Sequence, residues 1–99
     1  LRAKPVLLEP IMRLDIVTPG QYLGDVIADA SARRGRVTGI AGRGDTLTIQ
    51  GEVPLGEAFG YAASLRSLTQ GRASYTMEFL SYQELPANLV SQVVKRGRR

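Results

Sequence analysis

A near alternation of apolar and polar residues over residues 9–17 is the first clear pattern in the chain. Alternation of this kind predicts a strand with one face buried and the other in water. The buried side comprises Met12, Leu14 and Ile16, whereas Arg13 and Asp15 face the other way.

Apolar residues then recur at helical spacing, which predicts an amphipathic helix. Thr18 is a suitable N-cap, Pro19 suits the first helical position, and Gly35 ends the helix. The apolar stripe consists of Tyr22, Leu23, Val26, Ile27 and Ala30.

Two short strands follow at residues 37–41 and 46–53, joined by the sequence GRGD, whose glycines and Asp45 suit a hairpin turn. A second helix is expected over residues 55–68. Gly60 falls within it, where glycine costs about 1 kcal/mol relative to alanine, so we expect another backbone to approach closely there. The buried side of this helix comprises Leu55, Phe59, Ala62 and Leu65.

A fourth strand begins soon after the sequence TQGR at residues 69–72. Its inward residues are Tyr75, Met77 and Phe79. We expect Gly71 to adopt the left-handed conformation that commonly follows a helix. Residues 1–85 then form one domain, and Pro86 opens a short final helix with a basic tail over residues 86–99.

The resulting order of strands and helices is typical of the ferredoxin-like split β-α-β fold, in the α+β class. Right-handed crossovers give one antiparallel sheet with strand order 4-1-3-2 and both helices on one face. This topology brings residues 18–21, 43–45 and 69–72 to one edge of the sheet. Arg43 and Arg72 lie at that edge, and the opposite edge carries Arg33, Arg34, Gly35 and Arg36.

Composition indicates one soluble globular domain, since 43% of the 99 residues are hydrophobic and 22% are charged. The chain has no cysteine or histidine, which excludes disulfides, thiolate chemistry and the commonest general base. No apolar run approaches the ~20 residues of a membrane span, so we expect no membrane partner and a cytoplasmic location. The opening phrase LRAKPVLLEP lacks an initiator methionine, and we expect a longer parent protein.

The net charge of +4 does not by itself indicate nucleic-acid binding. Four of the thirteen lysines and arginines lie in the last five residues, and the other nine match the nine acidic residues. Exposed arginines commonly serve solubility alone, and cations in the last turn of a helix interact with its dipole by ~0.3–1 kcal/mol. Arg43 and Arg72 nevertheless lie beside loops with exposed N–H groups, which favours a surface that faces phosphate.

Two alternative functions share the expected topology. A small acylphosphatase-like phosphohydrolase needs an arginine in the loop after the first strand, and the sequence VTPGQY at that place has none. An ACT-like regulatory module binds its ligand at a dimer interface, which the sequence leaves open. The glycine-rich AGRGD is neither a P-loop nor a dinucleotide-binding fingerprint, and the carboxylates lack the spacing of a metal site.

Four phrases, PVLLEPIM, TPGQYLGDVIADASARRG, VPLGEAFGYAASLRSLTQGRASYTMEF and YQELP, resemble the carboxy-terminal domain of bacterial elongation factor G in order and spacing. The resemblance covers roughly residues 5–86. It implies the fifth, ferredoxin-like domain of a five-domain translational GTPase that acts in translocation during protein synthesis. A paralogue specialised in ribosome recycling is the alternative parent.

In that family the fifth domain is not itself an enzyme and binds no cofactor, whereas GTP and magnesium bind the GTPase domain of the same chain. The resemblance implies contacts with that GTPase domain and with the large ribosomal subunit, at the stalk-base RNA and its protein and near the sarcin-ricin loop. The matching positions expected at or beside ribosomal RNA are Gln70, Gly71, Arg72 and Ser74, together with Arg33, Arg34 and Gly35. Arg36 and Arg43, which the topology brings to the same two edges, are the remaining candidates for ribosome contact.

Overall fold

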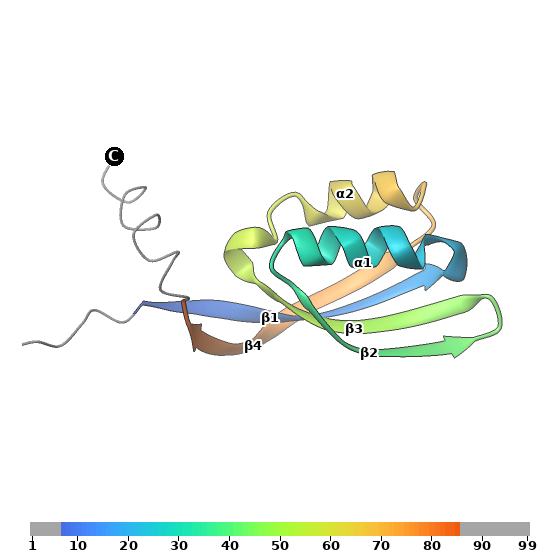
Figure 1. Ribbon diagram of the computed structural model, residues 1–99. Coiled ribbons are helices and arrows are strands. Elements are labelled where there is room, and N and C mark those ends of the chain that lie inside the picture. The colour runs from blue at the N-terminus through green and yellow to red at the C-terminus, as the bar shows by residue number, and fades with distance from the viewer. Residues whose placement is uncertain (1–6, 86–99) are drawn as a thin grey trace, which may run out of the picture.

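The computed structural model describes residues 7–85, whose elements follow the expected order (Figure 1). Four strands, β1 (Leu8–Pro19), β2 (Arg36–Arg43), β3 (Thr46–Pro54) and β4 (Ser74–Glu84), form one antiparallel sheet in the order β2-β3-β1-β4. The helices α1 (Leu23–Ala32) and α2 (Tyr61–Leu68) cover the same face of the sheet. The predicted fold class and strand order are confirmed. The final helix and basic tail predicted over residues 86–99 lie outside the described residues.

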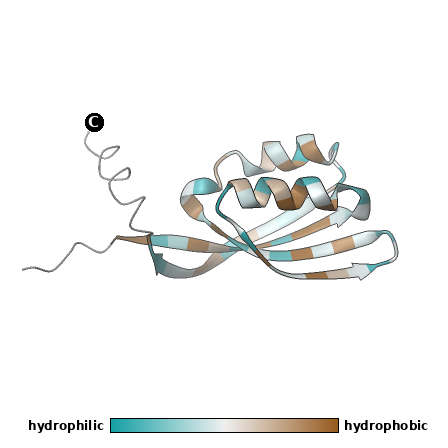
Figure 2. Ribbon diagram, in the orientation of Figure 1, coloured by the Kyte–Doolittle hydropathy of each residue, from teal (hydrophilic) through white to brown (hydrophobic). Residues whose placement is uncertain are grey.

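The core lies between the covered face of the sheet and the two helices, where apolar segments of both layers face each other (Figure 2). Tyr61 of α2 meets Tyr75 of β4 edge to face, with 5.1 Å between ring centroids. None of the described helices is both long and apolar enough to cross a membrane. The buried cluster consists of Leu14, Ile16, Tyr22, Val26, Ile49, Val53, Tyr61 and Leu65.

The start of the first helix differs from the prediction. Strand β1 continues through Pro19, which pairs with Thr46 of β3, and one 3-10 turn (Gly20–Tyr22) precedes α1. Thr18 does not cap the helix, because it is fully buried and its hydroxyl donates to the carbonyl of Pro19 at 3.1 Å. Pairing with β3 holds this stretch extended, and that pairing outweighs the local capping signal.

The second helix is shorter than predicted, because residues 55–68 break into two parts. A 3-10 turn (Leu55–Glu57) comes first, and α2 begins only after Gly60. Gly60 has a φ of +78°, a left-handed conformation that glycine adopts without strain. The expected close approach of another backbone is wrong, since no described atom beyond Gly60 and its two chain neighbours lies within 4 Å of its missing Cβ. Phe59, expected on the buried side, is 77% exposed.

Strand β4 packs on the core only near its start. Tyr75 and Met77 lie against the core, as predicted, whereas Phe79, predicted to face inward, is 53% exposed. The pairing of β1 with β4 shifts register between Ile11 and Met12, beside Phe79. Phe79 itself still pairs with Met12 in the register of Met77 with Leu14, so it keeps the predicted side of the strand and is exposed there because it lies outside the residues packed on the core.

Both helices end with a left-handed residue followed by a glycine. At the end of α1, Arg34 has a φ of +63° and the N–H of Gly35 donates to the carbonyl five residues earlier at 2.8 Å. At the end of α2, Gln70 has a φ of +54° and the N–H of Gly71 makes the equivalent bond, also at 2.8 Å. This is the Schellman arrangement, which satisfies carbonyls at a helix C-terminus. Gly71 has a φ of +77°, so its predicted left-handed conformation is confirmed.

Gly35 and Gly51 let three backbone segments meet with no side chain between them. A Cβ at Gly35 would lie 2.7 Å from the carbonyl oxygen of Ala30 and 3.1 Å from that of Glu52. A Cβ at Gly51 would lie 2.8 Å from the carbonyl oxygen of Arg36. The end of α1, the start of β2 and the middle of β3 are therefore in direct backbone contact.

Candidate nucleic-acid interface

At one end of the sheet, Arg33 is held by four hydrogen bonds. Its Nε donates to the carboxylate of Asp29 at 3.1 Å, and its Nη2 donates to the hydroxyl of Ser64 at 2.8 Å. Its Nη1 donates to the carbonyls of Glu57 at 2.7 Å and Phe59 at 3.0 Å. The side chain is only 16% exposed. Arg33 therefore ties the end of α1 to the turn before α2.

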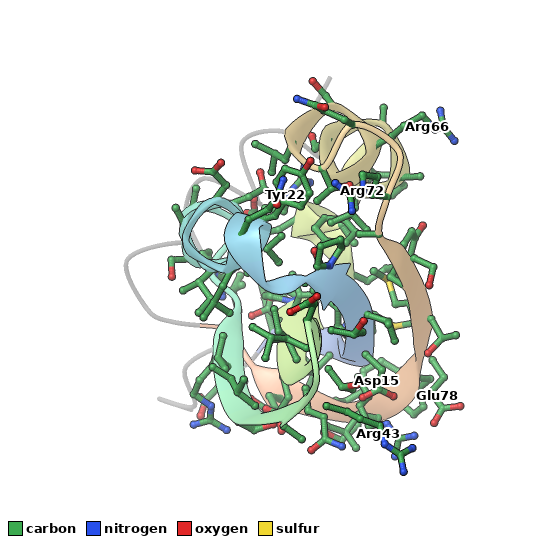
Figure 3. All side chains as sticks on the ribbon, turned by 90° about the vertical axis from the view of Figure 1, so that its right-hand side faces the viewer. Asp15, Tyr22, Arg43, Arg66, Arg72 and Glu78 are labelled. Carbon is green, nitrogen blue, oxygen red and sulfur yellow. The ribbon has the colours of Figure 1, made fainter. Side chains whose placement is uncertain are left out.

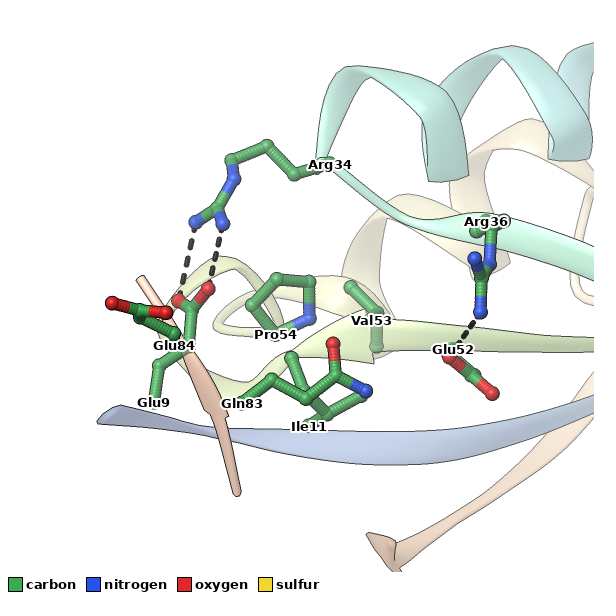
Figure 4. A pocket seen from close by; sticks show the side chains of 9 residues that line it. All are labelled: Glu9, Ile11, Arg34, Arg36, Glu52, Val53, Pro54, Gln83 and Glu84. Atoms are coloured by element: carbon green, nitrogen blue, oxygen red, sulfur yellow. Dashed lines mark hydrogen bonds and ion pairs between the residues drawn. The ribbon is translucent and has the colours of Figure 1, made fainter. Parts of the chain in front are cut away.

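Arg34 and Arg36, at the same end, are paired with carboxylates (Figure 4). Arg34 donates from both terminal nitrogens to Glu9 of β1, at 3.2 and 2.6 Å. The hydrogen-bonded carboxylate raises the pKa of Arg34 above its usual value, because it favours the charged form. Arg36 donates to Glu52, opposite it on β3, at 3.1 Å. These four residues line a cavity of about 200 Å³, and the cations of this end have partners within the fold.

At the opposite end of the sheet, three loops meet around a cleft of about 420 Å³ (Figure 3). They are the turn after β1, the hairpin between β2 and β3, and the connection from α2 to β4. The N–H of Gly20 donates to the carbonyl of Asp45 at 2.9 Å and joins the first two loops. The predicted meeting of the loops is confirmed. The cleft is lined by Pro19, Gly20, Gln21, Gly44, Asp45, Leu47 and Arg72.

The turn that carries Arg72 is fixed by Thr69, which is fully buried. The hydroxyl of Thr69 donates to the carbonyl of Leu65 at 2.7 Å and accepts from the N–H of Ala73 at 3.3 Å. The N–H of Arg72 donates to the carbonyl of Thr69 at 2.9 Å. The guanidinium of Arg72 lies 5.9 Å from the centre of the Tyr22 ring, within cation–π range (Figure 3). The backbone of the turn thus presents this cation from a fixed position.

Three exposed arginines at this end, Arg43, Arg66 and Arg72, make no ion pair with any residue from 7 to 85. Arg43 pairs with Thr46 of β3, three residues before the buried Ile49, so the two positions lie on opposite faces of the sheet. Arg43 therefore points to the face that the helices leave uncovered, whereas Arg72 lies on the side of the helices (Figure 3). Arg66 is a candidate that the sequence patterns did not indicate. Its place in the last turn of α2, just before the loop, was the available signal.

These arginines can bind anions and aromatic rings, because the planar guanidinium donates hydrogen bonds in a fork and stacks on rings. Gln70 and Ser74 are exposed beside Arg72, and their contacts with RNA stay predictions. Within the described part of the chain, no group of three or more histidine, cysteine or acidic side chains is placed to hold a metal ion. The exposed arginines of this end offer ionic and hydrogen-bonding recognition.

Comparison with known proteins gives consistent matches over nearly the whole chain. The family model described as Elongation factor G C-terminus matches residues 6–93. Proteins named Elongation factor G from two strains of Dehalococcoides mccartyi are 53% identical over 94 residues, which is 95% of this chain and 14% of each relative. A crystal structure of a protein from Thermus thermophilus has a TM-score of 0.89 and 43% identity, and covers 98% of this chain and 15% of that one. The chain therefore spans about one seventh of the length of its relatives.

Proposed function

Because the chain belongs to the family of elongation factor G C-termini, we propose that it is the ribosome-docking domain of a translational GTPase that acts in translocation. This domain supplies contacts and leaves the chemistry to the rest of the parent. We assign GTP and magnesium to a GTPase domain elsewhere in the parent, and the chain itself spans 14% of the length of its relatives. The parent works in the cytoplasm. Within the parent, the present domain packs beside the GTPase domain.

The contrast between the two ends of the sheet carries this proposal. At one end Arg33, Arg34 and Arg36 are bonded to acceptors of the same chain. At the other end Arg43, Arg66 and Arg72 make no ion pair with a described residue. An unpaired guanidinium can neutralise a phosphate and release its counterions, whereas a paired one must first lose its carboxylate.

We assign the cleft end to ribosomal RNA of the large subunit, at the stalk base with its protein and near the sarcin-ricin loop. The fixed backbone of the 69–72 turn supports this assignment, because a cation on a rigid turn loses less conformational entropy on binding than one on a mobile loop. The paired end has a supporting role, in which Arg33, Arg34 and Gly35 hold the shape of the domain.

Binding of the 99-residue chain to isolated large ribosomal subunits over a range of salt concentrations tests the proposal. Weak, salt-sensitive binding is expected. Arg72→Ala, Arg43→Ala and Arg66→Ala should each weaken binding, and each lost phosphate contact should reduce the slope of log affinity against log salt by roughly one unit.

Arg36→Ala is the matched control, because Arg36 is 73% exposed yet paired with Glu52. It should leave affinity and salt slope unchanged. A triple variant of Arg43, Arg66 and Arg72 that binds subunits like the wild type would refute the assignment of this end. Circular dichroism of every variant confirms that the comparison is between folded proteins.

A further inference from the structure

The cleft at the loop end holds two unpaired charges of opposite sign. Asp45 and Arg72 both line it, and neither side chain forms an ion pair with a residue described by the structure. Six of the other eight carboxylates of the fold are paired with arginine within residues 7–85, as Glu9 is with Arg34 at 2.6 Å, and the two exceptions are Asp25 and Glu84. An acidic residue in the cleft also weakens a simple phosphate site, because it repels anions.

The backbone keeps these two residues in place on separate loops. The carbonyl of Asp45 accepts from the N–H of Gly20 at 2.9 Å, which fixes the hairpin to the turn after β1. Arg72 stands on the turn held by Thr69 and lies over the ring of Tyr22. The cleft therefore offers an anion-binding group and a hydrogen-bond acceptor on two loops whose backbones are held in place. A matching ligand carries both a phosphate and a pair of donors.

We propose that this cleft binds a single unstacked guanosine of an RNA, with its phosphate on Arg72 and its Watson–Crick edge on the carboxylate of Asp45. The inference rests on the proposed docking to ribosomal RNA and adds a base preference to it. Bases that leave the stack in RNA loops are commonly recognised on this edge. The volume of about 420 Å³ lies within the ~300–1,000 Å³ typical of small-ligand sites.

Guanine follows from the chemistry of the acceptor. A carboxylate has two acceptor oxygens and no donor. Guanine is the one common base whose Watson–Crick edge presents two adjacent donors, N1–H and the 2-amino group. Adenine and cytosine place an acceptor beside their amino donor, and uracil has one donor flanked by two carbonyls. Pro19 and Leu47 supply apolar surface in the same cleft for the face of the base.

RNA hairpins that differ at one loop position test this proposal. The 99-residue chain is titrated with hairpins whose uridine loop contains one guanosine, inosine or adenosine, and affinity is measured by fluorescence anisotropy. Inosine lacks only the 2-amino group. The guanosine hairpin should bind at least about fivefold more tightly than the inosine hairpin, as expected for loss of part of a bidentate contact. Guanosine monophosphate should bind much more weakly than the guanosine hairpin.

Asp45→Asn identifies the residue responsible. The amide keeps the shape of the carboxylate but offers one donor and one acceptor, so the preference for guanosine should disappear and adenosine should gain relative to it. Asp25→Asn is the matched control, because Asp25 is also exposed, forms no ion pair with a described residue and is not among the residues that line the cleft. It should keep the preference of the wild type.

The outcomes separate this inference from the proposed docking function. Equal affinity for the three hairpins, or an unchanged preference in Asp45→Asn, overturns the guanosine site and leaves RNA docking intact. Free guanosine monophosphate that binds as tightly as the guanosine hairpin assigns the cleft to a free nucleotide and overturns the RNA source. Failure of the wild type to bind any hairpin or ribosomal subunit overturns both.

Discussion

Replacing Arg33 by alanine should destabilise the domain strongly, because one side chain then loses four hydrogen bonds. Three of these bonds have neutral acceptors, namely two carbonyls and a hydroxyl, and the fourth has the carboxylate of Asp29. A net contribution of about 0.5–1 kcal/mol for each bond gives a loss of about 2–4 kcal/mol. That is a large share of the ~5–15 kcal/mol by which a domain is usually stable. Arg33→Lys should lose roughly half as much, because an ammonium cannot reproduce the guanidinium fork.

Urea unfolding followed by circular dichroism measures the change in the free energy of unfolding, and an unchanged m value shows that the unfolded states remain comparable. Arg36→Ala is the control, because its exposed ion pair with Glu52 should contribute at most about 1 kcal/mol. Ribosomal-subunit binding per folded molecule should be the same for Arg33→Ala and the wild type. If Arg33→Ala and Arg36→Ala unfold at the same urea concentration, the structural role assigned to Arg33 is wrong.

Two further predictions concern the backbone and the core. Gly71→Ala should lower the free energy of unfolding by ~1–2 kcal/mol, because the φ of +77° at Gly71 strains any residue with a Cβ. Gly24→Ala should raise the free energy of unfolding by up to ~1 kcal/mol, because Gly24 lies in α1 and its missing Cβ has no described atom within 4 Å beyond the helix itself. Urea midpoints that shift in the same direction for both variants would contradict this reasoning. Burial raises the pKa of Tyr61 to about 12, so its contribution to stability is complete below pH ~10 and is lost as the pH rises through 12. Tyr61→Phe should remove this loss between pH ~10 and ~12, and parallel losses in variant and wild type would exclude Tyr61 as its source.

Much of the fold could be predicted because the patterns that specify it are local. Alternation identified the strands, helical spacing identified α1, and the order of elements then limited the topology to the observed sheet. The errors lie where a distant contact outweighs a local signal. Thr18 has the residue type of an N-cap, but pairing of Pro19 with Thr46 keeps the chain extended there. Gly60 was placed within a helix because its positive φ cannot be deduced from apolar spacing.

The candidate site was only partly predictable for a related reason. The predicted strand order alone places the loops of Arg43 and Arg72 at the same end of the sheet, and no information on side-chain contacts is needed for this step. Whether a cation is paired depends on partners far away in sequence, as with Arg34 and Glu9 or Arg33 and Ser64. Sequence alone therefore placed Arg33 and Arg34 beside Arg72 among the expected RNA contacts and gave no role to Arg66.

The direct backbone contact at Gly35 and Gly51 has a mechanical consequence. A side chain between two segments can change rotamer under load, whereas two backbones already in contact cannot be pressed closer together. At this corner α1, β2 and β3 are joined without such a spacer. A force that pushes α1 toward the sheet would therefore be passed directly to β2 and β3 at this corner, because close-packed interiors compress little and transmit strain.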